Sequence, residues 1–192
     1  MEHSPRWSVA KTSIVTALTV AAFLGTMLIR IPIPATGGYF NVGDVFVVFA
    51  GLWLGPLAGL IVGAVGPTGA DAVGYPQFIL ATSVTKGLEG LLVGLIAYRA
   101  KSDARRFVAA VVGGTTIVLG YFVFEALIYP ALGKTIPLFA ITTVQQAIAE
   151  LVPNSVQGIV AVIIGLGLFK AVNARPERPP SGPSVSNGSR NI

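Results

Sequence analysis

Long runs of apolar residues dominate the pattern along the chain, and short polar or Pro- and Gly-rich stretches separate them. The runs cover residues 9–29, 45–65, 78–98, 107–128 and 147–169. Each is long enough to cross a hydrocarbon core as a helix, which takes about 20 residues. The pattern therefore predicts an all-α integral membrane protein that passes the bilayer several times.

The second apolar run is better explained as two helices than as one. A single helix over residues 43–74 would extend about 48 Å at 1.5 Å per residue, whereas a bilayer core is about 30 Å thick. Gly55 and Pro56 form a turn signal near its centre, and Pro67 is a further helix breaker. Spans 43–54 and 57–74 give a compact bundle of six transmembrane helices, in which the short span 43–54 tilts or is shielded by its neighbours.

Six spans place both termini on the same side, and basic residues in loops favour the cytoplasm. With the N-terminus inside, ten of the 13 basic residues face the cytoplasm, namely Arg6, Lys11, Arg99, Lys101, Arg105, Arg106, Lys170, Arg175, Arg178 and Arg190. A five-span arrangement with the N-terminus outside places nine there, so charge hardly separates the two. The Gly55-Pro56 hinge favours six spans with both termini cytoplasmic, in a multi-pass protein of the cell (plasma) membrane.

Composition agrees with this class. The chain is 53% hydrophobic and 11% charged, with a mean hydropathy of +0.76, whereas a soluble domain carries about a quarter charged residues. The net charge of +5 follows from the topology and does not call for a nucleic-acid partner. The first run lacks a small-residue cleavage site, so we expect a retained span. Residues 1–172 then form one six-helix transmembrane domain, and the Pro-, Ser- and Gly-rich segment 173–192 is expected to be a disordered cytoplasmic tail.

Two charged residues stand near the middle of one apolar run. Lys86 and Glu89 belong to the stretch TSVTKGLEGLLVGLIAY, residues 82–98. Ionisable groups in a bilayer cost several kcal/mol unless they are paired or hydrated, so each is a candidate for function. Their i, i+3 spacing puts them on one helix face. They form either an ion pair within the helix or a polar wall of a solute cavity.

Two later spans each carry polar side chains on one face. These are Tyr121, Glu125 and Tyr129 in the fifth span and Glu150, Asn154 and Gln157 in the sixth. Such groups often hold helices together, but convergence from three helices favours a small-molecule pocket. Pro153, next to Asn154, interrupts the hydrogen bonds of the sixth helix and frees a backbone carbonyl there for a ligand or water. Asp44 and Asp71, near the outer ends of their spans, are expected to face water or to cap helices.

Signatures of enzymes and of cofactor sites are missing. The chain has no zinc-protease helix, nucleophile elbow, phosphate-binding lysine loop or dinucleotide fingerprint. It has no cysteine, and its single histidine, His3, lies in the N-terminal leader, so no metal or other cofactor is expected. A transport or solute-capture role fits better than an intramembrane enzyme that uses Glu89 and Glu125 as acid and base. A solo ion-coupled or passive transporter remains the main alternative.

Four short motifs resemble those of a known family. They are the NxGD stretch at residues 41–44, the LGPxAG hinge at 54–59, the KGLEGLxxG helix at 86–94 and PNSVQG at 153–158. Their order and spacing over residues 9–170 resemble the substrate-specific S component of an energy-coupling factor (ECF) vitamin transporter. The likeness is strongest to the branch that contains riboflavin and hydroxymethylpyrimidine S components.

The resemblance implies an outward-facing vitamin pocket built from the first outer loop and spans four to six. The residues expected to bind substrate are Tyr39, Asn41, Lys86, Glu89, Tyr121, Glu125, Asn154 and Gln157. The resemblance also implies that an AxxxA motif, here Ala17 and Ala21, packs against a coupling membrane subunit, which works with two ATPase subunits. The charged groups favour a small polar heterocycle such as a thiamine precursor or pyridoxine, and riboflavin also fits.

Overall fold

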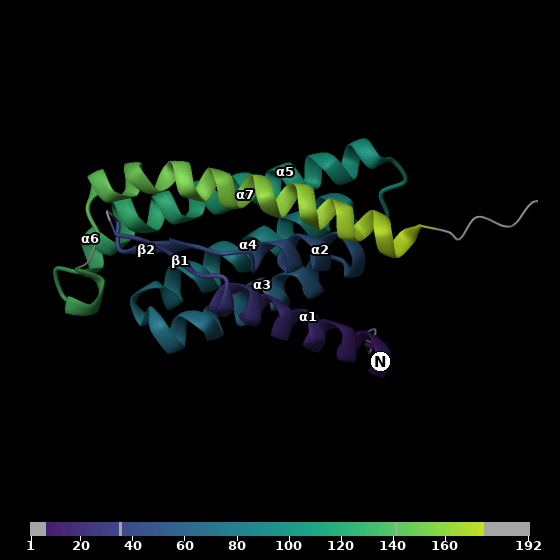
Figure 1. The fold of residues 1–192 in the computed structure, drawn as a ribbon, viewed down its shortest axis with the longest axis horizontal. Helices are drawn as coiled ribbons and strands as arrows, with labels where there is room; N and C mark the ends of the chain where they lie inside the picture. The colour runs from purple at the N-terminus through teal and green to yellow at the C-terminus, as the bar shows by residue number, and fades with distance from the viewer. Residues whose placement is uncertain (1–6, 35, 141, 175–192) are drawn as a thin grey trace, which may run out of the picture.

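The helices of the protein lie side by side along one long axis (Figure 1). A computed structural model describes residues 7–34, 36–140 and 142–174. The long helices are α1 (Val9–Leu28), α3 (Pro56–Gly74), α4 (Ile79–Ala97), α5 (Asp103–Val123) and α7 (Val144–Asn173). The shorter elements are β1 (Ile31–Ile33), β2 (Gly38–Phe40), α2 (Asp44–Leu54), η1 (Pro76–Phe78), η2 (Phe124–Ile128), α6 (Tyr129–Leu132) and η3 (Pro137–Phe139).

Five helical segments of the described chain are long and apolar enough to cross a bilayer. They are Val9–Leu28, Pro56–Gly74, Pro76–Ala97, Asp103–Leu132 and Val144–Asn173. The remaining apolar helix, α2, has 11 residues and extends about 17 Å, which is roughly half of a hydrocarbon core. The all-helical membrane class is therefore confirmed, and α2 is too short to count as a full span by itself.

The predicted division of residues 43–74 into two helices is present. Gly55 adopts φ 93°, a left-handed conformation that favours glycine, and Pro56 occupies the first turn of α3. Pro67 lies inside α3 and does not end it. Eight of the 11 residues of α2 are buried, because α1, α3, α4, α5 and α7 all pack around this helix. The expected shielding of the short helix by its neighbours is thus observed.

Glycines bring α4 against α3. A Cβ atom at Gly59 would collide with the backbone of Gly90, and one at Gly90 would collide with the backbone of Gly59. A third glycine of α3, Gly63, meets the backbone carbonyl of Lys86 in the same way. Close backbone contact of this kind is how helices associate in a bilayer, where no hydrophobic driving force acts between them.

The connection between α1 and α2 is a short antiparallel hairpin. Ile31 pairs with Phe40, Pro32 with Tyr39 and Ile33 with Gly38. Figure 1 shows the hairpin lying against the bundle at the end away from the N-terminus. This placement carries Tyr39 and the residues after it toward α3 and α7.

Both ends of the described chain lie at the same end of the bundle (Figure 1). That arrangement agrees with an even number of passes, and the assignment of this end to the cytoplasm stays a prediction. Most of the expected disordered tail, residues 175–192, lies outside the described residues, and α7 itself continues to Asn173.

Cysteine labelling tests the orientation, because the chain contains no cysteine of its own. Thr135 and Ser102 are both exposed, between α6 and η3 and between α4 and α5 respectively. In intact cells we expect Thr135→Cys to react with a membrane-impermeant thiol reagent and Ser102→Cys to react only after the cells are opened. Labelling of Ser102→Cys in intact cells would show that the orientation is reversed.

Candidate functional site

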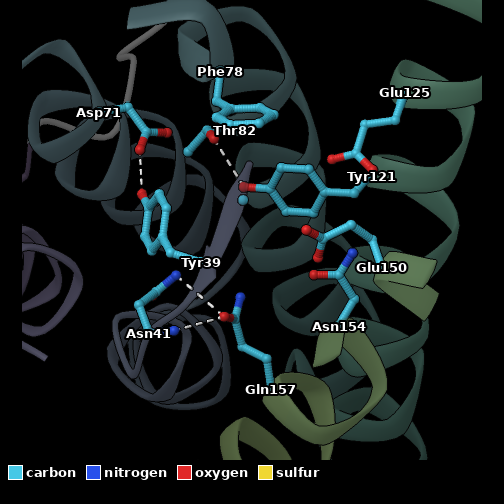
Figure 2. Close-up of a pocket in the computed structure, with 11 residues that line it drawn as sticks. Tyr39, Asn41, Asp71, Phe78, Thr82, Tyr121, Glu125, Glu150, Asn154 and Gln157 are labelled. Carbon is cyan, nitrogen blue, oxygen red and sulfur yellow. Dashed lines mark hydrogen bonds between the residues drawn. The ribbon is translucent and has the colours of Figure 1, made fainter. Parts of the chain in front are cut away.

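A cavity lies between the hairpin and four helices (Figure 2). Its lining residues come from β2 and the following loop, α3, η1, α4, α5, η2 and α7. They are Gly38, Tyr39, Asn41, Asp71, Phe78, Thr82, Tyr121, Glu125, Glu150, Asn154 and Gln157. The volume of the cavity is about 30 Å³, which is room for about two water molecules.

Six of the eight predicted substrate-binding residues come together around this cavity. They are Tyr39, Asn41, Tyr121, Glu125, Asn154 and Gln157. In Figure 2 the side chains of Glu125, Glu150 and Asn154 gather on one side, next to Tyr121. The convergence of α5, η2 and α7 with the hairpin is therefore a feature of the structure, whereas substrate binding by these residues stays a prediction.

A π-helical turn sets the position of Glu125. The turn η2 continues α5, and the amide of Tyr129 donates to the carbonyl of Phe124, five residues earlier. The carbonyl of Glu125 accepts a hydrogen bond from Thr142 Oγ1 at 2.9 Å, in the connection before α7. Single π turns interrupt helices at functional sites more often than elsewhere. Tyr129, expected on the same face, does not line the cavity, since its hydroxyl accepts from the amide of Ala81 at 3.1 Å.

Hydrogen bonds tie the walls of the cavity together. The hydroxyl of Tyr39 donates to Asp71, and the hydroxyls of Thr82 and Tyr121 lie 2.8 Å apart (Figure 2). Burial, followed by the neighbouring Asp71 charge, raises the pKa of the Tyr39 hydroxyl above its usual range. Tyr39 therefore keeps its proton and acts as a neutral donor to the carboxyl group.

Arg30 fixes the start of the hairpin to the end of α3. Its guanidinium lies 4.7 Å from the ring centre of Tyr39 and 4.8 Å from that of Tyr75. One of its nitrogens, Nη2, donates to the carbonyl of Ala70 at 3.0 Å. Cation–π contacts of this kind stabilise by about 0.5–2 kcal/mol. Arg30 thus holds Tyr39 in the wall of the cavity.

The tip of the hairpin rests on α7. Thr36 Oγ1 donates to Glu150 Oε1, and the amide of Gly38 donates to Thr36 Oγ1 at 3.2 Å. A Cβ atom at Gly38 would collide with the carboxyl group of Glu150, so any larger residue would make this carboxyl shift. One wall of the cavity is therefore held by the contact between the hairpin and this carboxyl.

Two carboxyl oxygens of the lining have no hydrogen-bond partner among the described residues. They are Oδ2 of Asp71 and Oε2 of Glu125, and both are buried. A buried polar atom without a partner costs about 1–3 kcal/mol, so such atoms mark places where a polar ligand or water binds. These two oxygens are available to accept hydrogen bonds from a molecule in the cavity.

The predicted pair of Lys86 with Glu89 is not formed. Lys86 Nζ lies 2.5 Å from Asp44 Oδ1 instead, and the side chains of both residues are 1% exposed. The other oxygen of Asp44 accepts from Gln157 Nε2 at 2.5 Å. The expectation that Asp44 faces water was therefore wrong, because this carboxyl is the buried counter-charge of Lys86.

Lys86 and Glu89 also do not line the cavity, in contrast with the prediction. Glu89 is 0% exposed, and neither of its carboxyl oxygens has a partner in the part of the chain that the structure describes. Both residues face the bundle interior, as the i, i+3 spacing predicted. The ion pair of Lys86, however, is with the carboxyl of Asp44 on α2 and not with Glu89. The burial of Lys86 in α4 is explained by Asp44 on α2, whereas no described residue pairs with Glu89.

Five lining residues were not among those predicted to bind substrate: Gly38, Asp71, Phe78, Thr82 and Glu150. Asp71, expected to face water, is fully buried. Thr82 stands four residues before Lys86, so helical periodicity could have placed it on the inner face. Glu150 was recognised on the inner face of α7 with Asn154. No local pattern marked Phe78.

The chain matches the family of ECF-type riboflavin transporter S components over residues 7–174. It is 38% identical over 148 residues to an uncharacterised protein of Pyrococcus woesei from the gap 3' region, covering 77% of this chain and 91% of that one. The fold resembles a solved S component of a bacterial ECF transporter, with a TM-score of 0.60 and 18% identity. That likeness covers 85% of this chain and 95% of the other.

The protein belongs to the ECF-type riboflavin transporter S component family. It is a substrate-binding S component of an ECF transporter, and the predicted resemblance is confirmed. The family is one of transporter subunits, which bind a small molecule and work with an ECF module.

Two isosteric substitutions test the new pairing of Lys86. Asp44→Asn removes the counter-charge of a buried lysine and is expected to lower the free energy of unfolding by about 3–5 kcal/mol. Glu89→Gln makes the same chemical change at a second fully buried carboxyl, whose oxygens have no partner among the described residues, so a much smaller loss is expected. Unfolding of both variants in detergent gives the comparison. A larger loss for Glu89→Gln would mean that Glu89 neutralises Lys86 after all.

Proposed function

We propose that the protein captures riboflavin from outside the cell for uptake driven by an ECF module. The observation that carries the proposal is the cavity of Figure 2, in which aromatic rings and hydrogen-bonding groups converge from the hairpin and four helices. The family to which the chain belongs is named after the same vitamin. Pyridoxine, hydroxymethylpyrimidine and other thiamine precursors are the competing ligands.

The lining matches the chemistry of a flavin. Its ring system is flat and carries ring carbonyls and an N–H group, and its side chain carries several hydroxyls. Tyr39, Phe78 and Tyr121 offer aromatic surface for the ring system. The amide of Asn154 can donate to a ring carbonyl, and the unpartnered oxygen of Glu125 can accept from a hydroxyl or from the ring N–H.

The charges of the lining favour a vitamin without a phosphate. Asp71, Glu125 and Glu150 supply three carboxyl groups, and no lysine, arginine or histidine is among the described residues that line the cavity. A phosphate would meet carboxyl oxygens there without a cation in the lining to neutralise it, and burying an unpaired charge is costly. The free vitamin is therefore expected to bind more tightly than flavin mononucleotide.

Binding requires the cavity to widen. A pocket for a ligand of this size has about 300–1,000 Å³, far more than the roughly 30 Å³ present. The hairpin is the element best suited to move, since it pairs through only three residues on each strand and contacts α7 through Thr36 and Glu150. We propose that the ligand displaces the hairpin outward and replaces the hydrogen bond between Tyr39 and Asp71.

The outer face of α1 is proposed to contact the coupling subunit. Ala17 is exposed and Ala21 is half-buried, while the helix packs on α2 and α3 through its other side. Small residues on an exposed helix face allow a second helix to approach closely. The coupling membrane subunit and its two ATPase subunits would supply the energy, because the chain itself has no nucleotide-binding motif.

Titration of riboflavin into the purified protein, followed by flavin fluorescence, tests the ligand. Glu125→Gln replaces one acceptor oxygen with a donor NH2 group and Asn154→Ala removes the side-chain amide, and we expect each to weaken binding about 5- to 150-fold. Glu89→Gln is the matched control outside the cavity and should leave the affinity unchanged. Flavin mononucleotide should bind more weakly than riboflavin. Binding of pyridoxine or a thiamine precursor, with none of riboflavin, would reassign the ligand within the same transporter class.

Substitution on α1 separates partner contact from ligand capture. Ala17→Trp is expected to abolish co-purification with the coupling and ATPase subunits, because a large side chain prevents close helix approach. Riboflavin binding by the isolated variant should match the wild type. Leu119→Trp, at a 57% exposed position on α5, is the control and should leave the complex intact. An intact complex with Ala17→Trp would place the coupling interface elsewhere.

A further inference from the structure

A groove follows the seam between α5 and α7 on the outside of the bundle, away from the vitamin cavity. Its wider part, about 470 Å³, lies where α5 begins and α7 ends, and is bordered by Arg106, Phe107, Gly167, Phe169 and Lys170. This is the end of the bundle at which both ends of the described chain lie. The groove therefore opens beside the predicted cytoplasmic loops.

A second, narrower part continues along the same seam. It holds about 400 Å³ and shares Phe107 and Ile163 with the first part, so the two are contiguous. Its lining residues are apolar or have small side chains. They include Val111, Val118 and Ile159 together with Gly114 and Gly158. The surface thus changes from charged at the end of the bundle to apolar toward the middle.

Glycines create the apolar part. A Cβ atom at Gly114 would lie 3.1 Å from the carbonyl oxygen of Gly158, and one at Gly158 would lie 2.8 Å from that of Gly114. The two helices therefore touch through their backbones at this point, and no side chain from either glycine fills the seam. From Phe107 to Val118 the groove extends about 17 Å along α5. One leaflet of a bilayer core is about 15 Å deep, so the groove has the length of one lipid tail.

The wide part carries positive charge. The guanidinium of Arg106 lies 5.1 Å from the ring centre of Phe169. It donates hydrogen bonds to Asp103 Oδ1 and to the carbonyl of Ala100, each at 2.6 Å. Lys170 is exposed and forms no ion pair with any described residue. Asp103 is the one acidic residue in the lining and is already paired with Arg106. Arg99, Lys101 and Arg105 in the preceding segment add to the basic field.

We propose that this groove binds an anionic phospholipid. The phosphate lies between Arg106 and Lys170, and one acyl chain lies in the apolar part along Gly114 and Gly158. A basic group next to a chain-length apolar channel matches the two ends of such a lipid, and basic residues at a membrane surface attract anionic headgroups. An apolar helix of a partner protein could also pack in the apolar part of the groove. It would not supply an anionic group for Lys170 at the wide end of the groove.

Native mass spectrometry of the full chain in detergent, with equal amounts of added phosphatidylglycerol and phosphatidylcholine, tests the proposal. The wild type should retain phosphatidylglycerol in preference. Lys170→Gln should reduce that retention about fivefold, the effect of one basic residue near an anionic surface. Lys134→Gln removes the same charge at the other end of the bundle and should change nothing.

A second variant fills the groove without disturbing the fold. No atom lies within 4 Å of a Cβ atom placed at Gly167, so Gly167→Leu adds a side chain into open space. It should lower retention of phosphatidylglycerol while riboflavin binding and thermal unfolding stay as in the wild type. Equal retention of both lipids by the wild type would overturn the proposal. So would a Gly167→Leu variant that keeps its lipid but no longer assembles with the coupling subunit, since the groove would then bind protein.

Discussion

The ion pair between Asp44 and Lys86 is the contact on which the rest of the structure depends. It joins α2 to α4, and the second oxygen of Asp44 extends it to Gln157 on α7. Gln157 Oε1 in turn accepts from the backbone amide and the side-chain amide of Asn41, at 2.9 and 3.2 Å. Asn41 Oδ1 accepts from Thr26 on α1 at 3.3 Å. One buried polar network therefore connects four helices and the end of the hairpin.

This network also reaches the cavity of Figure 2, because Asn41 and Gln157 line it. Their amide groups are already engaged with each other and with Asp44, which fixes their orientation before a ligand arrives. Among the described residues, buried carboxyl oxygens of Asp71 and Glu125 on the other side of the cavity have no hydrogen-bond partner. The cavity thus has one wall whose polar groups are paired and another with unused hydrogen-bonding capacity.

The short helix α2 makes this arrangement possible. Because it extends through only about half of a bilayer core, the remaining depth is open to the hairpin, which brings Tyr39 against Asp71. Glycines at the contact of α3 with α4 and at the contact of α5 with α7 let the surrounding helices close around α2. The outer faces of α1 and of the seam between α5 and α7 are the proposed sites for a partner and for lipid.

The sequence by itself determined the membrane class, the division at Gly55-Pro56, the family and the inward faces of the later helices. Hydropathy, helical period and turn chemistry are local, so Glu125 and Asn154 could be placed on inner faces from their neighbours along the chain. The partner of Lys86 could not, since Asp44 is 42 residues away and reaches it only through the packing of α2 against α4. Asp71 was misplaced for the same reason. Which polar group meets which depends on which helices are neighbours in space, and that is decided by tertiary packing.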